Sequence, residues 1–291
     1  MSDVPRRTLS ELEFIYSQDR DRRDVYVEGS FDAAVLHWFT HECALNGVAV
    51  YPISAIEISD GDIIAAGRKA NNRERVVHLA DFLADSDARR AACVVDADFW
   101  SLRAAQAPAP PLYQTDYSCM EMYFFSAQSL GKFFTLCCRR SEWPVETIME
   151  SLASVLQEFF LYRCANDDLG WGMDWLDKNV CMKVTGWQID FDKDEYLTRF
   201  LHKNSRAREK TRFVEHVTQL RTRLKADARY QMDGHDMMSL LAWYIRKKGI
   251  GRERCQDENV LMCLTMTLDH RIFQKEHMFQ MLSARLGKDA E

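Results

Sequence analysis

The chain has 291 residues, of which 47% are hydrophobic and 28% are charged, so it can bury one large core or two modest ones. It contains no run of about 18 apolar residues that would span a bilayer, and the charges near its N-terminus are unlike the apolar segment of a signal peptide. We therefore expect a globular, cytoplasmic protein with no membrane partner, and its net charge of −6 argues against a generally basic surface for nucleic acid.

Short β-rich runs alternate with helical stretches in the first part of the chain. Strands are expected at 24–29, 48–58, 91–100 and 111–117, and helices at 31–45 and 68–83. Strands that alternate with helices predict a mainly parallel sheet with helices on both faces. The fold class predicted for residues 1–135 is therefore an α/β domain.

The remaining residues, 136–291, have almost no strand signal. Amphipathic stretches predict helices at 145–164, 212–224 and 235–248. We expect a helical domain for substrate binding and assembly. Its aromatic runs "FFLY" and "WGMDWL" are expected in its core, and the alternative is a platform on which bases stack. Long apolar faces near Leu261 and Met278 predict a homodimer or a docking surface for a partner.

Acidic side chains follow the predicted strands of the α/β part. Glu28 ends the first strand in "VYVEG", and Asp32 comes one helical turn later. Asp96 and Asp98 end the run "CVVDAD", where alternation along an extended segment would point both side chains the same way. Glu121 opens the helix after the next strand.

The carboxyl ends of parallel strands meet at one edge of a sheet, so these five carboxylates are expected to converge there. Close carboxylates repel one another unless a multivalent cation neutralises them. Oxygen ligands without a thiolate pattern favour Mg²⁺, Mn²⁺ or Ca²⁺ over zinc. Two alternatives stay open: a lone DxD is common in surface turns, and Glu28 could pair with a nearby arginine.

A second candidate feature is a basic segment, which we define as residues 199–229. It carries ten Lys or Arg and three acids, an excess that suits a phosphate-facing surface. The alternative is a solvated helix face. The candidate nucleic-acid contacts are Arg206, Arg208, Lys210, Arg212, Arg221 and Arg223.

The arrangement of EGxxD after one strand, DxD after a later strand and Glu at a helix start resembles the Toprim fold. That metal-binding domain is shared by topoisomerases, bacterial primases and several nucleases. "TDYSCMEMYFF" is similar to the acidic segment of the overcoming-lysogenization-defect nucleases, in which a glutamate joins the metal site, and Glu121 is the matching position. "DGHDMMSLL", residues 233–241, resembles a Gly-His-Asp segment of a bacterial family whose Toprim-like domain is followed by helices.

The resemblance implies a nuclease that uses Mg²⁺ or Mn²⁺ to cleave phosphodiester bonds, with RNA such as tRNA favoured over DNA. One role in that bacterial family is the Toprim effector subunit of the PARIS anti-phage system, a nuclease held by an ABC-type ATPase until a phage protein triggers it. The implied metal ligands are Glu28, Asp32, Asp96, Asp98 and Glu121, and the implied catalytic residues are Glu28, Asp96, Asp98 and His235.

One departure concerns a lysine that the related nucleases often use near the C-terminal end of the site. His235 is the better candidate for that position here, and Lys210 is a weak one. Alternatively, "DGHD" only caps the following helix through Asp233. The alternative functions are a DNA nuclease, another Toprim phosphoryl-transfer enzyme and a non-catalytic, cation-binding regulatory module. Strand passage would need an active-site tyrosine domain, and primer synthesis usually needs a zinc-binding module; neither is recognisable in the sequence.

Overall fold

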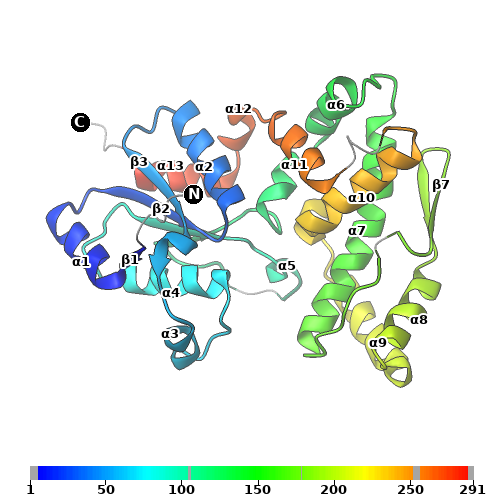
Figure 1. Ribbon diagram of the computed structural model, residues 1–291, viewed down its shortest axis with the longest axis horizontal. Coiled ribbons are helices and arrows are strands. Elements are labelled where there is room, and N and C mark those ends of the chain that lie inside the picture. Colours follow the sequence, from blue (N-terminus) through cyan, green and yellow to red (C-terminus); the bar gives the residue numbers. More distant parts are fainter. Residues whose placement is uncertain (1–5, 104–105, 178, 252–255, 288–291) are drawn as a thin grey trace. The chain divides into compact units, whose positions relative to one another are not determined.

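The computed structural model describes residues 6–103, 106–177, 179–251 and 256–287 (Figure 1). The chain divides into two compact units. The first unit comprises Met1–Ala97, Gln106–Asp116 and Asp269–Glu291, and the second comprises Asp98–Ala105 and Tyr117–Leu268. The chain therefore passes between the units several times, whereas the sequence predicts one boundary between residues 135 and 136.

The first unit contains parallel strands and flanking helices. Its strands are β1 (Arg7–Thr8), β2 (Arg23–Val27), β3 (Val48–Pro52), β4 (Ile56–Glu57), β5 (Ala92–Val95) and β6 (Leu112–Gln114). Its helices are α1 (Leu9–Gln18), α2 (Ser30–Glu42), the 3₁₀ helix η1 (Ile53–Ala55), α3 (Asp60–Ala65), α4 (Asn72–Ala84), α12 (His270–Phe273) and α13 (His277–Leu286).

Four of these strands form a parallel sheet in the order β3-β2-β5-β6. Val25 of β2 pairs with Val50 of β3 on one side and with Ala92 of β5 on the other, and Val94 of β5 pairs with Tyr113 of β6. β2 and β5 are apolar at most positions, as expected of parallel strands covered on both faces. The predicted α/β class with a mainly parallel sheet is confirmed.

Helices cover both faces of this sheet (Figure 1). Tyr26 and Cys93 share a buried core with Leu12 of α1 and Leu79 of α4. The connection from β2 through α2 to β3 and the connection from β3 through α4 to β5 cross the sheet in opposite directions. Right-handed crossovers then place these two helices on opposite faces. α13 packs against α2, since Phe39 and Phe279 meet with ring centroids 4.6 Å apart. The C-terminal helices thus complete the α/β unit, which the sequence analysis did not anticipate.

The second unit is mostly helical, as predicted. Its helices are α5 (Trp100–Arg103), α6 (Ala127–Leu136), α7 (Val145–Asp168), α8 (Lys193–Lys203), α9 (Lys210–Arg221), α10 (Gly234–Lys247) and α11 (Asp257–Thr265). Three short 3₁₀ helices are η2 (Met120–Phe124), η3 (Ala207–Glu209) and η4 (Ala228–Gln231). An antiparallel hairpin of β7 (Met182–Thr185) and β8 (Gln188–Phe191) is present although almost no strand was expected in this region.

The core of the second unit forms around α7 and α10. The run "FFLY" in α7 is buried, which confirms its predicted place in the core. Trp175 stacks on Phe200 of α8 with ring centroids 4.7 Å apart, and both Trp171 and Trp175 are half-buried. None of the helices in the described part of the chain is both long and apolar enough to cross a bilayer.

Candidate functional site

Glu28 and Asp96 lie directly after two neighbouring parallel strands, β2 and β5. The backbone N–H of Asp96 donates a hydrogen bond to Oε1 of Glu28 at 3.0 Å. Because β3 and β5 flank β2 on opposite sides, the carboxyl ends of β2 and β5 form the topological switch point of the sheet. Ligands of open α/β sheets bind at such points. The first unit therefore places these two predicted residues where a ligand crevice is expected.

Asp32 lies in the first turn of α2, as the sequence predicts. Its Oδ2 accepts a hydrogen bond from the backbone N–H of Gly29 at 3.2 Å, so the carboxylate caps the start of the helix. A carboxylate at this position also complements the positive end of the helix dipole. Glu28, Asp32 and Asp96 thus occupy the same end of the sheet in the first unit.

Arg73 is a cation that meets Glu28 in the structure. Its Nη1 is 3.8 Å from Oε1 of Glu28 and also donates to the backbone oxygen of Asp96. The neighbouring Asn72 donates through Nδ2 to the backbone oxygen of Glu28 at 3.2 Å. Sequence reasoning left an arginine partner open but did not identify Arg73. A crossover helix of a parallel sheet begins near the edge where the strands have their carboxyl ends. The place of Arg73 in the first turn of α4 could therefore have indicated that it lies close to Glu28.

The segment after β5 does not stay extended, which corrects the alternation expected for Asp96 and Asp98. Asp98 has a φ of +45°, and its N–H donates to the backbone oxygen of Ser118 at 2.7 Å. The N–H of Ala97 donates to Oγ1 of the buried Thr115 at 2.9 Å. Asp98 is exposed and belongs to the second unit, whereas Asp96 is half-buried in the first.

The second unit brings Glu121 against the start of α10. A Cβ added to Gly234 would lie 2.5 Å from Oε2 of Glu121, so only glycine leaves room for this carboxylate. Asp233 caps the helix by accepting the N–H of Asp236 at 2.9 Å, which confirms the capping role proposed for "DGHD". His235 is exposed and follows the glycine that touches Glu121. Glu121 and the Gly-His-Asp segment are therefore neighbours, as a shared site would require.

Gly234→Ala is expected to displace the Glu121 carboxylate while leaving the unfolding temperature near that of the wild type. If the chain is the metal-dependent nuclease that the resemblance implies and Glu121 acts where the structure places it, cleavage in Mn²⁺ should fall about 10- to 100-fold, as when a group that orients a metal ligand is disturbed. Gly131→Ala in α6 is the matched control, since its new Cβ would have its nearest neighbour at 3.7 Å, an ordinary contact. Unchanged cleavage by Gly234→Ala would show that the position of Glu121 is irrelevant.

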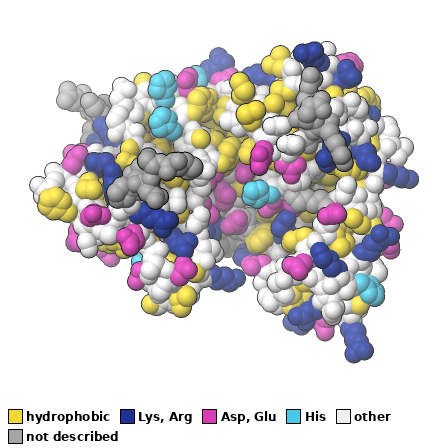
Figure 2. All heavy atoms as spheres, viewed as in Figure 1, with side chains coloured by type: hydrophobic (Ala, Val, Ile, Leu, Met, Phe, Trp, Pro, Cys, Tyr) yellow, Lys and Arg dark blue, Asp and Glu magenta, His cyan; other side chains and the backbone are white. Residues whose placement is uncertain are grey.

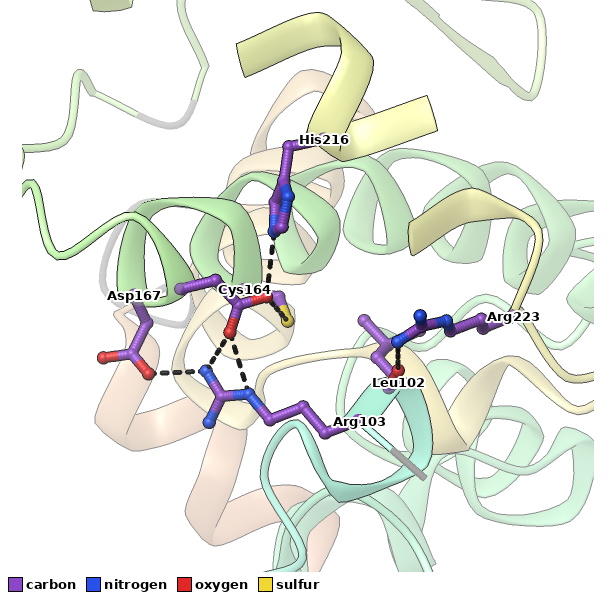
Figure 3. A network of polar contacts seen from close by, with 7 residues as sticks. Leu102, Arg103, Cys164, Asp167, His216 and Arg223 are labelled. Atoms are coloured by element: carbon purple, nitrogen blue, oxygen red, sulfur yellow. Dashed lines mark hydrogen bonds and ion pairs between the residues drawn. The ribbon is translucent and has the colours of Figure 1, made fainter. Parts of the chain in front are cut away.

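A polar network fixes α5, which begins two residues after Asp98 (Figure 3). Arg103 donates to Asp168 at 2.9 and 2.6 Å and to Asp167 at 2.6 Å, and Asp168 also meets Nε2 of His216 at 2.9 Å. Burial raises the pKa of Asp168, but the hydrogen bonds from His216 and Arg103 outweigh it and leave that pKa below its usual value. The network joins α5 to α7 and α9 and so supports the segment that carries Asp98.

Two of the predicted nucleic-acid contacts are engaged within the second unit. Arg221 donates to both carboxylate oxygens of Glu158 at 2.5 and 2.7 Å. Arg223 donates to the backbone oxygen of Leu102 at 2.8 Å, as Figure 3 shows. A phosphate would have to compete with these partners for both guanidinium groups.

Neutralising Arg221 is therefore expected to affect stability more than binding. Arg221→Gln should lower the free energy of unfolding by about 1 to 2 kcal/mol, because a charged hydrogen-bonded pair is lost at a partly exposed position. Chemical unfolding and filter binding of labelled RNA measure the two effects. A large loss of RNA affinity with normal stability would restore Arg221 to the nucleic-acid surface.

The other predicted contacts are Arg206, Arg208, Lys210 and Arg212, around η3 and the start of α9. The guanidinium groups of Arg206 and Arg212 lie 5.1 and 5.8 Å from the ring centroid of Trp171, and Lys210 donates to Oγ1 of Thr198 at 2.9 Å. In Figure 2, Lys and Arg side chains gather over the part of the second unit that carries α8 and α9.

No group of three or more His, Cys, Asp or Glu side chains is arranged to hold a metal ion among the residues that the structure describes. Glu28, Asp32 and Asp96 belong to the first unit, and Asp98, Glu121 and His235 belong to the second. The shared five-carboxylate centre therefore stays a prediction. Comparison with models of known protein families and with curated proteins gives no match to this chain.

Proposed function

We propose that the chain is a nuclease that requires Mg²⁺ or Mn²⁺ and cleaves phosphodiester bonds, with RNA such as tRNA favoured as substrate. The observation that carries the proposal is the hydrogen bond from the backbone N–H of Asp96 to the Glu28 carboxylate, at the switch point between β2 and β5. Two carboxylates at the carboxyl ends of adjacent parallel strands suit a ligand site better than a structural one, since each is only half-buried.

The proposed ligands Glu28, Asp32 and Asp96 offer carboxylate oxygens, which Mg²⁺ and Mn²⁺ prefer. A bound divalent ion would supply charge stabilisation at the scissile phosphate and a more acidic water. Glu28, Asp32 and Asp96 would provide oxygen ligands at the sheet edge, and Arg73 places a guanidinium suited to phosphate beside them. Asp98, Glu121 and His235 are the further site residues that the resemblance implies, and we propose them as such.

The proposed biological role is that of a toxic effector in anti-phage defence, controlled by an ABC-type ATPase partner. Its support is the motif resemblance, together with the lack of a GxxxxGK[ST] segment in the sequence, so that ATP dependence would come from the partner. Leu136, Met262 and Met266 are 71%, 59% and 84% exposed on α6 and at the end of α11. This apolar surface in the second unit supports the proposed assembly, either as a homodimer or with the ATPase.

The proposal is tested by incubating the purified chain with end-labelled RNA and DNA in Mg²⁺ or Mn²⁺, with EDTA as the control. Cleavage of RNA that stops with EDTA is the expected result. Cleavage of DNA alone would correct the substrate class. Cleavage that persists with EDTA would contradict the metal requirement.

The pairing of Glu28 with Arg73 favours a second candidate, a non-catalytic module, because an arginine already compensates the carboxylate. Such a module would cleave neither RNA nor DNA, yet Mn²⁺ would still raise its unfolding temperature if the carboxylates bind a cation. Absence of cleavage together with this stabilisation would replace the nuclease proposal.

A further inference from the structure

The loop after α7 presents a tryptophan between two glycines. Gly170 and Gly172 have φ values of +64° and +58°, and a Cβ added to either would meet nothing within 4 Å. Trp171 therefore stands on a sharply turned loop with open space beside both of its neighbours. Its own backbone is anchored, since its N–H donates to the backbone oxygen of Asn166 at 3.1 Å. The ring is held in place and remains half-exposed.

One side of this ring is supported by the core, and its surroundings are cationic. Trp171 stacks on the fully buried Phe213 with ring centroids 5.7 Å apart and an angle of 25° between the planes. Arg206 and Arg212 lie over the ring, and the exposed Arg208 sits between them in sequence. We call these four residues, Trp171, Arg206, Arg208 and Arg212, the Trp171 surface.

The arginines of the Trp171 surface are not explained by stability of the fold. None of the three forms an ion pair within the described ranges, in contrast to Arg199, which meets Glu195 at 2.7 Å. Cation–π contacts at exposed positions contribute only about 0.5 to 1 kcal/mol each. The guanidinium groups of Arg206 and Arg212 repel one another because both lie at the same ring. An anionic ligand would neutralise this repulsion and so stabilise their arrangement more than water does.

We infer that the Trp171 surface binds single-stranded nucleic acid, with an unpaired base stacked on Trp171 or on a neighbouring guanidinium plane and phosphates held by the arginines. Aromatic rings interleaved with arginines are suited to flexible strands, because every base has a face to stack and the backbone is anionic. Bases within a duplex are already stacked and cannot reach the ring. The inference deepens the proposed function, since it assigns an unpaired substrate segment to the second unit.

The test is a binding titration with labelled single-stranded RNA, in EDTA so that no cleavage occurs, with the same sequence as single-stranded DNA and as duplex RNA. Trp171→Leu should weaken binding of single strands about 5- to 150-fold and leave duplex binding almost unchanged. Trp171→Phe, which keeps a flat ring, should retain most of the affinity. Wild-type affinity in Trp171→Leu would overturn the inference.

Charge variants test the arginines separately. The double variant Arg206→Gln with Arg212→Gln should reduce the slope of log affinity against log salt by about 1 to 1.5, because two phosphate contacts are lost. The double variant Arg20→Gln with Arg271→Gln is the matched control, since both arginines are exposed, pair with Asp87 and Asp269 and lie outside the basic segment, and it should leave the slope unchanged. An equal change of slope in both variants would show only a loss of net charge.

Ultraviolet cross-linking of the wild-type protein avoids the possibility that a variant misfolds. RNA that contains 4-thiouridine should cross-link to the peptide carrying Trp171, and cross-links confined to other peptides would contradict the inference. The cleavage assay separates this result from the proposed function. Trp171-dependent binding without cleavage would leave the inference standing and remove the nuclease, whereas cleavage with binding independent of Trp171 would do the reverse.

Discussion

Glu28→Gln is expected to abolish cleavage in Mn²⁺, with a loss of at least about 100-fold, because ligand charge at the proposed metal site supplies several kcal/mol of transition-state stabilisation. The fold should be kept. The amide oxygen can still accept the N–H of Asp96, and the lost ion pair with Arg73 is long, at 3.8 Å, and partly exposed. The free energy of unfolding should therefore change by less than about 1 kcal/mol.

The matched control for Glu28→Gln is Glu57→Gln, which makes the same change at an exposed position of β4 in the first unit. Its cleavage rate should equal that of the wild type. Asp96→Asn should behave like Glu28→Gln, since both residues follow adjacent strands. An active Glu28→Gln protein would remove the assigned site, and an unfolded one would show that the Glu28 carboxylate is structural.

Asp236→Ala should lower the free energy of unfolding by about 3 to 5 kcal/mol, the largest stability effect that we expect. Asp236 is 1% exposed and receives two hydrogen bonds from Arg163, at 2.6 and 2.7 Å. Burial lowers the pKa of Arg163, but the bonds with Asp236 outweigh it and raise that pKa above its usual value. Removing the carboxylate would leave a largely buried guanidinium without this partner.

Glu195→Ala is the control for burial, because Glu195 and Arg199 also meet at 2.7 Å but on an exposed helix face. Glu195→Ala should lower the free energy of unfolding by no more than about 0.5 kcal/mol. Chemical unfolding followed by circular dichroism measures both variants. If both variants lowered the free energy of unfolding equally, burial would not determine how much each ion pair stabilises the protein. Because Asp236 follows His235, the stable pair also fixes the start of α10 where Glu121 makes its contact.

The parallel sheet could be predicted because its strands are short apolar runs separated by helical stretches. The hairpin of β7 and β8 was missed, although its sequence carries a signal: Met182 and Val184 alternate with polar residues before a Gly-Trp turn, and Ile189 and Phe191 alternate with polar residues after it. The return of α12 and α13 to the first unit was not readable. It depends on packing such as that of Phe39 with Phe279, which are far apart in the sequence.

The neighbouring positions of Glu28 and Asp96 followed from one rule, that parallel strands end at a common edge. The orientation of the Asp98 side chain could not be predicted by the same rule. Its backbone has a φ of +45°, and its N–H donates to the backbone oxygen of Ser118, which lies in a later segment. Charge counting alone could not reveal that Arg221 pairs with Glu158, which lies 63 positions earlier. Local sequence patterns therefore predicted which residues lie at the edge of the sheet. The hydrogen-bond partners of individual side chains could be identified only from the folded structure.

A metal site at the ends of β2 and β5 is tested by Mn²⁺ binding to the wild-type chain, followed by electron paramagnetic resonance of the free ion. We expect saturable binding for which Mg²⁺ competes. Glu28→Gln and Asp96→Asn should each abolish or strongly weaken it, while Glu57→Gln should bind as the wild type does. Absence of saturable binding, or equal binding by Glu28→Gln and the wild type, would contradict a metal site at the ends of β2 and β5.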